Sequence, residues 1–189
     1  MKSVAVYCGS AVGNLESYAE AARTLGQELA RRGLTLVYGG GNVGLMGIVA
    51  DACLAGGGTV IGVIPRQLLN LELAHPGITQ LEVVDTMAQR KTRMEELADA
   101  FVCLPGGAGT LEELAEVLTM QQLGHVTGPI GLVDVDGFWH PFHSMFAAMA
   151  ERGFVQERFV DALVIAPAPA EVLDRFATWA NPGTKWGDH

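Results

Sequence analysis

Residues 34–44 read LTLVYGGGNVG, and residues 100–113 read AFVCLPGGAGTLEE. Each stretch begins with a short apolar run that favours a β-strand, passes through a glycine-rich loop and continues into a segment with helical periodicity. Glycine lets a loop turn its backbone N–H groups toward a ligand at close range, and a helix N-terminus adds partial positive charge. Two such loops predict a phosphate-bearing ligand at the carboxyl edge of a parallel sheet.

The same alternation of apolar and amphipathic segments continues along nearly the whole chain. Strands are expected at Val4–Tyr7, Thr35–Tyr38, Val60–Ile64, Leu81–Val84, Ala100–Leu104, Ile130–Val133 and Leu163–Ile165. Helices are expected at Ser17–Arg32, Leu45–Ala55, Met87–Leu97, Leu111–Leu123, Pro141–Arg152 and Ala170–Ala180. Apolar strands separated by amphipathic helices indicate an α/β fold, with a doubly wound, Rossmann-like parallel sheet of about seven strands. Right-handed crossovers then bring both glycine loops to one edge of the sheet.

Length and composition indicate one domain over residues 1–180, followed by a loose tail at 181–189 that is rich in Gly, Pro and Asp. The net charge of −9 predicts repulsion of nucleic acids and anionic membranes, so neither is an expected partner. No apolar run is long enough to span a membrane, and no secretory signal is evident. Cys8, Cys53 and Cys103 have apolar neighbours and no metal-binding spacing, which favours a cytoplasmic protein with buried, reduced thiols and no metal.

The first glycine loop also satisfies the dinucleotide fingerprint G-x-G-x-x-G, at Gly39, Gly41 and Gly44. That fingerprint needs an acidic residue about 20 positions later, at the end of the next strand, to hold a ribose. The next strand ends in GVIPR at residues 62–66, without an acid, so NAD or FAD is disfavoured and no cofactor is expected. Three successive glycines exceed what a tight turn needs, which favours Gly40 and Gly41 as ligand contacts. The long connection over residues 65–79 is expected to form a lid or wall of the site.

The second glycine loop lacks the Gly-Lys-Ser/Thr of a P-loop, which argues against an ATPase. Thr110 and Glu113 have the spacing of a helix capping box, in which the Glu side chain reaches back to a backbone N–H. On spacing alone, a capping role and a functional role for Glu113 are equally open. Glu112 is interpreted as a solvated acid in the first helical turn. Ser10, in the loop after the first strand, is placed to donate a hydrogen bond to a ligand.

Arg90 and Lys91 lie near the start of the helix expected at Met87–Leu97, where Thr86 and Gln89 have the spacing of another capping box. Cations there oppose the helix dipole, at a cost of about a few tenths of a kcal/mol each. In an acidic chain, this unfavourable placement predicts an anion site. The arginine suits bidentate contacts with phosphate or carboxylate, and the lysine supplies a point charge.

Taken together, these motifs resemble the LONELY GUY (LOG) family of cytokinin-activating phosphoribohydrolases, whose members were often mislabelled lysine decarboxylases. The resemblance extends through about residue 164, and its most specific part is P-G-G-x-G-T-x-x-E at residues 105–113. The other matching stretches are CGS at 8–10, VYGGGNVGLMG at 37–47, GVIP at 62–65, RK at 90–91 and QLG at 122–124.

The resemblance implies a homodimer that hydrolyses the N-glycosidic bond of N6-modified adenosine 5′-monophosphates, giving the free base and ribose 5-phosphate. It assigns the catalytic pair to Arg90 and Glu113. It also implies substrate contacts at Glu72, Lys91, Gly107, Ala108, Gly109, Thr110 and Thr119. Ala88 stands where the family usually has His, and Met120 where it commonly has Trp. Both departures leave the catalytic pair intact and bear on the shape of the base pocket.

The residues suit this chemistry. Glycosidic cleavage builds positive charge on the ribose, and a carboxylate such as Glu113 can stabilise that charge and orient water. Arg90 is expected to fix Glu113 and to bind anionic or hydroxyl groups of the substrate. Two alternatives stay open, a general AMP nucleosidase and a nucleotide-binding module without turnover. A pyridoxal-dependent decarboxylase is disfavoured, because the lysines are only Lys2, Lys91 and Lys185, two of them near the termini.

Overall fold

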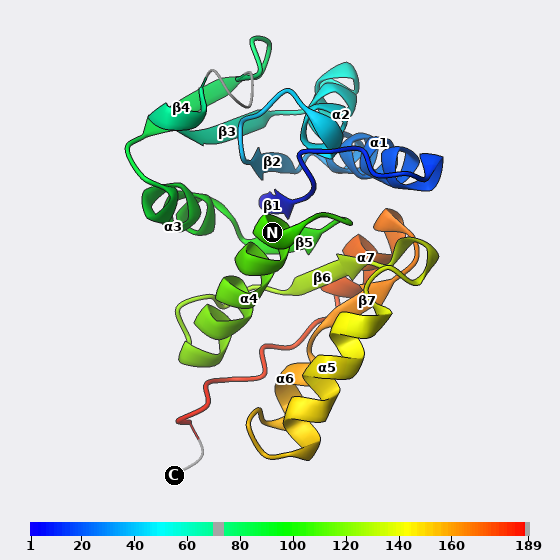
Figure 1. The fold of residues 1–189 in the computed structure, drawn as a ribbon, viewed down its shortest axis with the longest axis vertical. Helices are drawn as coiled ribbons and strands as arrows, with labels where there is room; N and C mark the ends of the chain where they lie inside the picture. Colours follow the sequence, from blue (N-terminus) through cyan, green and yellow to red (C-terminus); the bar gives the residue numbers. More distant parts are fainter. Residues whose placement is uncertain (70–73, 188–189) are drawn as a thin grey trace.

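Seven parallel strands form one sheet in the computed structural model, which describes residues 1–69 and 74–187 (Figure 1). The strands are β1 (Ser3–Tyr7), β2 (Thr35–Tyr38), β3 (Val60–Pro65), β4 (Gln80–Val84), β5 (Ala100–Cys103), β6 (Ile130–Val133) and β7 (Val164–Ala166). They lie in the order β4-β3-β2-β1-β5-β6-β7, and each neighbouring pair is parallel. The predicted doubly wound parallel sheet is therefore confirmed.

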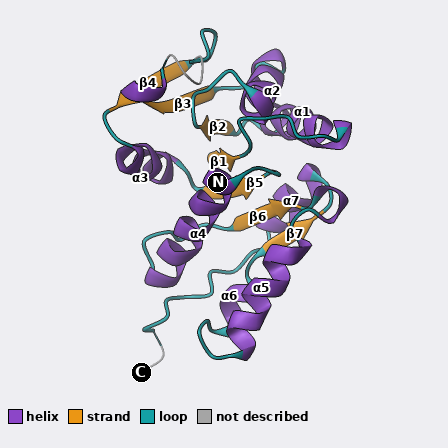
Figure 2. Cartoon of the chain, in the orientation of Figure 1, coloured by secondary structure: helices purple, strands orange, loops and turns teal. Residues whose placement is uncertain are grey.

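Helices cover both faces of this sheet (Figure 2). They are α1 (Glu16–Arg31), α2 (Gly44–Ala55), α3 (Met87–Leu97), α4 (Ala108–Leu123), α5 (His140–Glu151), α6 (Glu157–Asp161) and α7 (Pro169–Phe176), with 3₁₀ turns η1 (Arg66–Leu68) and η2 (Val135–Gly137). Helices α1, α2 and α7 contribute to the core on one face, and α3 to α6 to the core on the other. The sequence does not indicate α6, whose five residues are too few for a helical period to be recognised.

Strand β1 shows why the strands are apolar on both faces. Val4 and Val6 belong to the core cluster that includes α1 and α2, whereas Ala5 and Tyr7 belong to the cluster that includes α3 and α4. All four side chains are at most 2% exposed. A central parallel strand is covered by helices on both faces, so its sequence is a continuous apolar run and does not alternate between apolar and polar residues. The buried strand supplies a rigid base for the loop that follows it.

The strand order reverses at β1, with β2 on one side and β5 on the other. In open α/β sheets, ligands bind beyond the carboxyl edge at such a reversal. The loop at residues 8–10 and both glycine loops leave these three neighbouring strands at this edge. Backbone hydrogen bonds tie them together, since Gly9 N donates to Pro105 O at 3.1 Å and Leu45 N donates to Gly9 O at 3.0 Å. The topology therefore assembles the motifs that the sequence singled out.

Residues 181–187, the described part of the C-terminal tail, form hydrogen bonds with the end of α4 and with the segment that follows it. Asn181 Nδ2 donates to the backbone oxygen of Thr127 at 3.3 Å, and Lys185 N donates to the backbone oxygen of Gln122 at 2.9 Å. Residues 188–189 lie outside the described part of the chain, and the looseness of the tail stays a prediction. Hydrogen bonds to a distant segment cannot be inferred from a Gly- and Pro-rich composition.

All three cysteines are free and buried, as their apolar neighbours predicted. Within residues 1–69 and 74–187, no helix is both long enough and apolar enough to cross a membrane. Over the same residues, no three His, Cys, Asp or Glu side chains gather as a group that could hold a metal ion.

Candidate active site

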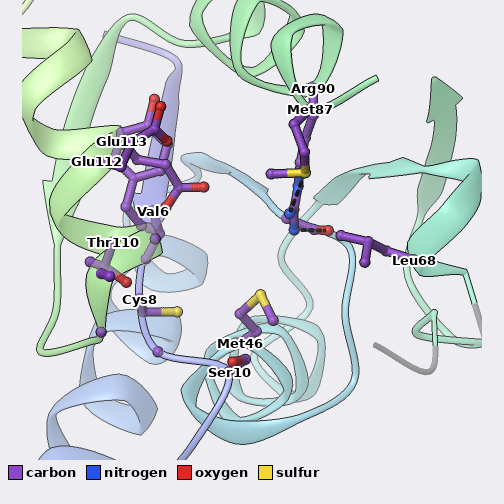
Figure 3. A pocket seen from close by; sticks show the side chains of 16 residues that line it. Val6, Cys8, Ser10, Met46, Leu68, Met87, Arg90, Thr110, Glu112 and Glu113 are labelled. Atoms are coloured by element: carbon purple, nitrogen blue, oxygen red, sulfur yellow. Dashed lines mark hydrogen bonds between the residues drawn. The ribbon is translucent and has the colours of Figure 1, made fainter. Parts of the chain in front are cut away.

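A cavity of about 290 Å³ opens at the reversal of strand order (Figure 3). The residues that line it are Val6, Tyr7, Cys8, Gly9, Ser10, Gly39, Met46, Leu68, Met87, Arg90, Gly107, Ala108, Gly109, Thr110, Glu112 and Glu113. They come from the end of β1 and its loop, the end of β2, the helix α2, the turn η1, and the first turns of α3 and α4. Leu68 lies in the long connection after β3, so the described start of this connection contributes to a wall of the site.

Arg90 is fixed in one wall of the cavity. Its side chain is 4% exposed, and its guanidinium donates from Nε to Val63 O at 3.1 Å and from Nη2 to Gly39 O at 2.6 Å. These two carbonyls belong to β3 and to the loop after β2, so the guanidinium holds three elements together. Because arginine stays protonated in proteins, the wall carries a permanent positive charge in a set orientation.

The start of α3 places Arg90 at this wall. Thr86 Oγ1 accepts from Gln89 N at 3.1 Å, and Gln89 Oε1 accepts from Thr86 N at 3.2 Å. These reciprocal bonds form the predicted capping box and fix where the helix begins. Arg90 then falls at the end of the first helical turn, directed at the carboxyl edge of the sheet.

The capping box that the spacing of Thr110 and Glu113 left open does not form, because Thr110 is not the N-cap of the helix. Helix α4 begins at Ala108, with Gly107 as its N-cap and no side-chain capping bond. Leu111 N donates to Gly107 O at 3.1 Å, so Thr110 already lies inside the first turn. Extended glycine is a tolerated N-cap, which lets the helix start directly at the glycine loop. Figure 3 shows Glu113 on the α4 side of the cavity and Arg90 on the other side.

The second glycine loop packs closely against its own helix. Thr110 is 4% exposed, and a Cβ atom added to Gly106 would lie 2.2 Å from Thr110 Oγ1 and 2.9 Å from Gly9 N. Only glycine fits between these groups. Residues 107–110 line the cavity with the N-terminal turn of α4, where backbone N–H groups lack helical acceptors. This turn is therefore suited to an anion such as a phosphate.

Of the ligand contacts expected in the loops after β1 and β2, Ser10 lines the cavity, and Gly40 and Gly41 are not among its described lining residues. The roles of all three as ligand contacts stay predictions. Gly40 O accepts from His75 N at 3.0 Å, and Gly41 pairs with Ala74 in an antiparallel bridge. Gly39 lines the cavity instead, because the chain turns away after it to meet the segment that precedes β4.

Three further expected contacts lie away from this lining or outside the described residues. Lys91 Nζ contacts Glu112 and lies 2.7 Å from Glu116 Oε2, and Lys91 is not among the lining residues. Thr119 Oγ1 donates to Ala115 O at 2.8 Å and also lies off the cavity. Glu72 falls in the segment 70–73, outside the described residues. Their roles as substrate contacts stay predictions.

Glu113 and Arg90 affect the pKa values of buried residues that line the cavity. Burial raises the pKa of the Cys8 thiol above its ordinary value, the Glu113 carboxylate raises it further, and Arg90 lowers it. Burial, followed by Glu113, likewise raises the pKa of Tyr7. Cys8 and Tyr7 therefore stay protonated at neutral pH. The thiol is not poised as a nucleophile, because the thiolate is the reactive form.

Sequence reasoning did not single out Tyr7 or Met46 as lining residues. Tyr7 ends β1, which reads as an ordinary buried run, and its place at the site follows from the central position of β1 in the sheet. The signal that could have found Tyr7 is the alignment of strand ends, since parallel strands end at the same edge of a sheet. Glu112, interpreted as a solvated acid, lines the cavity and contacts Lys91.

Comparisons with known proteins show the family of the chain. The family described as "Possible lysine decarboxylase" matches residues 46–176. "Cytokinin riboside 5'-monophosphate phosphoribohydrolase LOG" of Oryza sativa subsp. japonica is 44% identical over 190 residues, covering 99% of this chain and 78% of the relative. "Cytokinin riboside 5'-monophosphate phosphoribohydrolase LOG1" of Arabidopsis thaliana is 43% identical over 174 residues, covering 92% of this chain and 82% of the relative. The chain belongs to the LOG family.

Solved structures share the fold of this LOG family member at lower identity. A molybdenum cofactor binding protein from Rippkaea orientalis aligns with a TM-score of 0.73 and 21% identity, over 94% of this chain and 96% of that one. The molybdenum cofactor carrier protein of Chlamydomonas reinhardtii aligns with a TM-score of 0.71 and 19% identity, over 94% and 96% of the two chains. At such identity the likeness shows the fold alone, because one fold serves many ligands.

Proposed function

We propose that this protein hydrolyses the N-glycosidic bond of nucleoside 5′-monophosphates, with N6-modified adenosine 5′-monophosphates as preferred substrates. The products are the free base and ribose 5-phosphate. The observation that carries the proposal is the cavity on which Glu113, Arg90 and the N-terminus of α4 converge. The two phosphoribohydrolases that are 44% and 43% identical to the chain support the choice of reaction and substrate class.

The first turn of α4 is the proposed phosphate site. Gly107, Ala108, Gly109 and Thr110 line the cavity there, and their backbone N–H groups lie at the positive end of the helix. The Ser10 hydroxyl lines the same cavity and can donate a further hydrogen bond. Binding of the phosphate at this turn would fix the position of the ribose along α4. The binding energy of the phosphate, which does not itself react, is then used to orient the glycosidic bond.

Glu113 is the proposed catalytic carboxylate. Water adds to C1′ of the ribose as the C1′–N bond breaks, and the base leaves with the bonding electron pair and takes up a proton. The positive charge that develops on the ribose is stabilised by a nearby carboxylate, which also orients the water. Among the described lining residues, the acidic and basic side chains are Glu112, Glu113 and Arg90, two acids to one base, a balance that suits a cationic transition state. Arg90 binds and orients substrate oxygens.

The apolar part of the cavity is the proposed surface for the base. Met46, Leu68 and Met87 line it, and methionine side chains adapt to flat ligands of different shape. Ala88 is exposed on α3, and Met120 packs against the core beneath α4. Neither residue is among those that line the described cavity.

Chromatographic measurement of free base tests the function. The protein is incubated separately with AMP and with isopentenyl-AMP, and adenine or the modified base is quantified over time. Faster release from isopentenyl-AMP supports the proposal. Equal rates would indicate a general AMP nucleosidase, and binding without base release would indicate a nucleotide-binding module. Lysine decarboxylation has no support in the site, since the described lining residues include no lysine to carry pyridoxal phosphate.

A homodimer is part of the proposal, with the second copy bordering the active site. Leu111, on the catalytic helix α4, is 42% exposed, and Met145 on α5 is 48% exposed. Both line an apolar hollow of about 350 Å³ that shares Gly107 and Ala108 with the cavity. A second copy that covers this surface would bury apolar area next to the substrate. We expect light scattering to give twice the chain mass of 20.0 kDa. A fully active monomer at assay concentration would contradict this expectation.

Gly39→Ala tests whether the first glycine loop holds Arg90. An added Cβ atom would lie 2.0 Å from Arg90 Nη2 and 2.9 Å from its Cζ, so the guanidinium must move. We expect kcat/KM for the nucleotide to fall by about tenfold or more. Gly77→Ala is the control, because among the described residues its Cβ would meet only the His75 ring, at an ordinary 3.5 Å. Equal activity of both variants would show that this orientation of Arg90 is not needed.

A further inference from the structure

His75 is a buried histidine, 7% exposed, whose two ring nitrogens both have partners. Nδ1 accepts a hydrogen bond from Gly77 N at 3.1 Å, and Nε2 lies 3.0 Å from Asp51 Oδ1. Because a backbone N–H can only donate, Nδ1 of the neutral ring is the acceptor. Nε2 then carries the hydrogen and donates a hydrogen bond to the Asp51 carboxylate. The ring is therefore held in one tautomer and one orientation.

This ring joins two elements that contribute apolar side chains to the cavity. Asp51 lies on α2, whose first turn carries Met46. His75 belongs to the connection between β3 and β4, whose described start carries Leu68 in η1. Figure 3 shows Met46 and Leu68 at the cavity. The hydrogen bond between His75 and Asp51 therefore ties the connection to the helix that supplies Met46.

Backbone hydrogen bonds extend this tie to the cavity wall. Ala74 N donates to Leu69 O at 3.1 Å, which joins the two described parts of the connection. His75 N donates to Gly40 O at 3.0 Å, so the connection also packs on the first glycine loop. Leu68 directly precedes Leu69, and its place on the wall therefore depends on where residues 74 and 75 are held.

The bond between His75 and Asp51 contributes position more than stability. The Asp51 side chain is 69% exposed, so water can replace the ring as its partner and the domain should remain folded without the bond. A tie of this kind fixes the relative position of two elements that otherwise share few side-chain bonds. Small displacements of such elements are enough to weaken contacts with a bound ligand.

We propose that His75 is a positioning residue for recognition of the base. Its imidazole fixes η1 relative to α2, and it thereby holds Leu68 and Met46 in place as surfaces against which the base packs. This inference rests on the proposed function, which assigns the apolar part of the cavity to the base. Among the described residues, the hydrogen bonds of His75 reach α2, the first glycine loop and Gly77, whereas the proposed phosphate site lies on α4. Phosphate binding should therefore be independent of His75.

Two variants of His75 test this role. His75→Leu removes both hydrogen bonds of the ring, whereas the side-chain amide N–H of His75→Gln can still reach Asp51. We expect His75→Leu to raise KM for AMP about fivefold or more, with kcat within about threefold of the wild type, and His75→Gln to recover most of this loss. A merely structural role would lower the folded fraction and leave KM unchanged.

Asp51→Ala removes the other partner of the bond. If the two side chains act through one bond, the double variant that combines His75→Leu with Asp51→Ala should have the KM of His75→Leu alone. Additive increases in KM would contradict a tie to α2.

His125→Leu is the matched control. His125 is exposed between α4 and β6, at the opposite edge of the sheet from the cavity. This variant should keep the KM of the wild type. A rise in KM comparable to that of His75→Leu would contradict a specific role for His75.

Titration calorimetry with AMP and with ribose 5-phosphate gives a readout that does not depend on turnover. Ribose 5-phosphate has the phosphate and the sugar but lacks the base. His75→Leu should weaken the binding of AMP about fivefold or more and leave that of ribose 5-phosphate within about twofold. Equal weakening of both ligands, or of neither, would overturn the proposal.

The same titrations separate this proposal from the proposed reaction. If His75→Leu does not fold, Asp51→Ala carries the test, because its site is exposed. Failure of the wild type to release base would refute the reaction, and the two titrations would still decide the role of His75. A wild type that binds AMP no more tightly than ribose 5-phosphate would overturn the role of His75, because the base would then add nothing to binding.

Discussion

Glu113→Gln is expected to keep the fold and to lose at least about two orders of magnitude in turnover, the scale typical of a lost transition-state charge stabiliser. The amide has the shape of the carboxylate but no charge to oppose the positive ribose. Because α4 begins at Ala108 and is capped by Gly107, the substitution removes no helix cap. The change in kcat is measured by base release, and thermal unfolding followed by circular dichroism checks that the fold is intact.

Glu112→Gln is the control for this prediction, because Glu112 is the adjacent acid and lines the same cavity. Its side chain is 56% exposed, so solvent screens its charge and we expect a loss of less than about tenfold. A larger loss from Glu112→Gln than from Glu113→Gln would move the catalytic role to Glu112. Near-native turnover of Glu113→Gln would remove Glu113 from the mechanism altogether.

Removal of the 5′-phosphate from the substrate is expected to have an effect at least as large. Charge-assisted hydrogen bonds contribute about 1.5–3 kcal/mol each, so the loss of two would lower kcat/KM by about three orders of magnitude. The first turn of α4 supplies such donors at residues 107–110, and Ser10 adds a hydroxyl. Adenosine should therefore be a far poorer substrate than AMP.

The comparison is made as kcat/KM for adenosine and AMP under identical salt. Ribose 5-phosphate serves as the matched probe, since it keeps the phosphate and lacks the base, and it should inhibit AMP hydrolysis competitively. Equal kcat/KM for the two substrates would show that the glycine loop at residues 105–109 has no role in recognition. Inhibition by ribose but not by ribose 5-phosphate would lead to the same conclusion.

Local physical chemistry allowed much of the structure to be predicted from the sequence. The order of strands and helices follows from hydrophobic periodicity, which reflects burial within each segment. The capping box of Thr86 and Gln89 follows from spacing along one turn, and the structure contains it. Arg90 and Glu113 were singled out with the help of family resemblance, and both line the cavity. Each of these inferences needs groups that are close in the sequence.

Contacts between distant segments decided the rest. The spacing of Thr110 and Glu113 fits a capping box, yet α4 starts earlier because its glycine loop packs on the loop after β1. The backbone oxygen of Gly40 accepts a hydrogen bond from His75 N, 35 positions later in the sequence. Gly39, and not Gly40, therefore lines the described cavity.

The charged residues show the same division. The sequence determined that Arg90 and Lys91 stand side by side near a helix start, and this placement in an acidic chain predicted an anion site. The tertiary structure decided that Arg90 is buried against the carbonyls of Gly39 and Val63, while Lys91 turns to Glu116 on the neighbouring helix. Adjacent residues on a helix point about 100° apart, so which partner each meets depends on the elements packed around the helix.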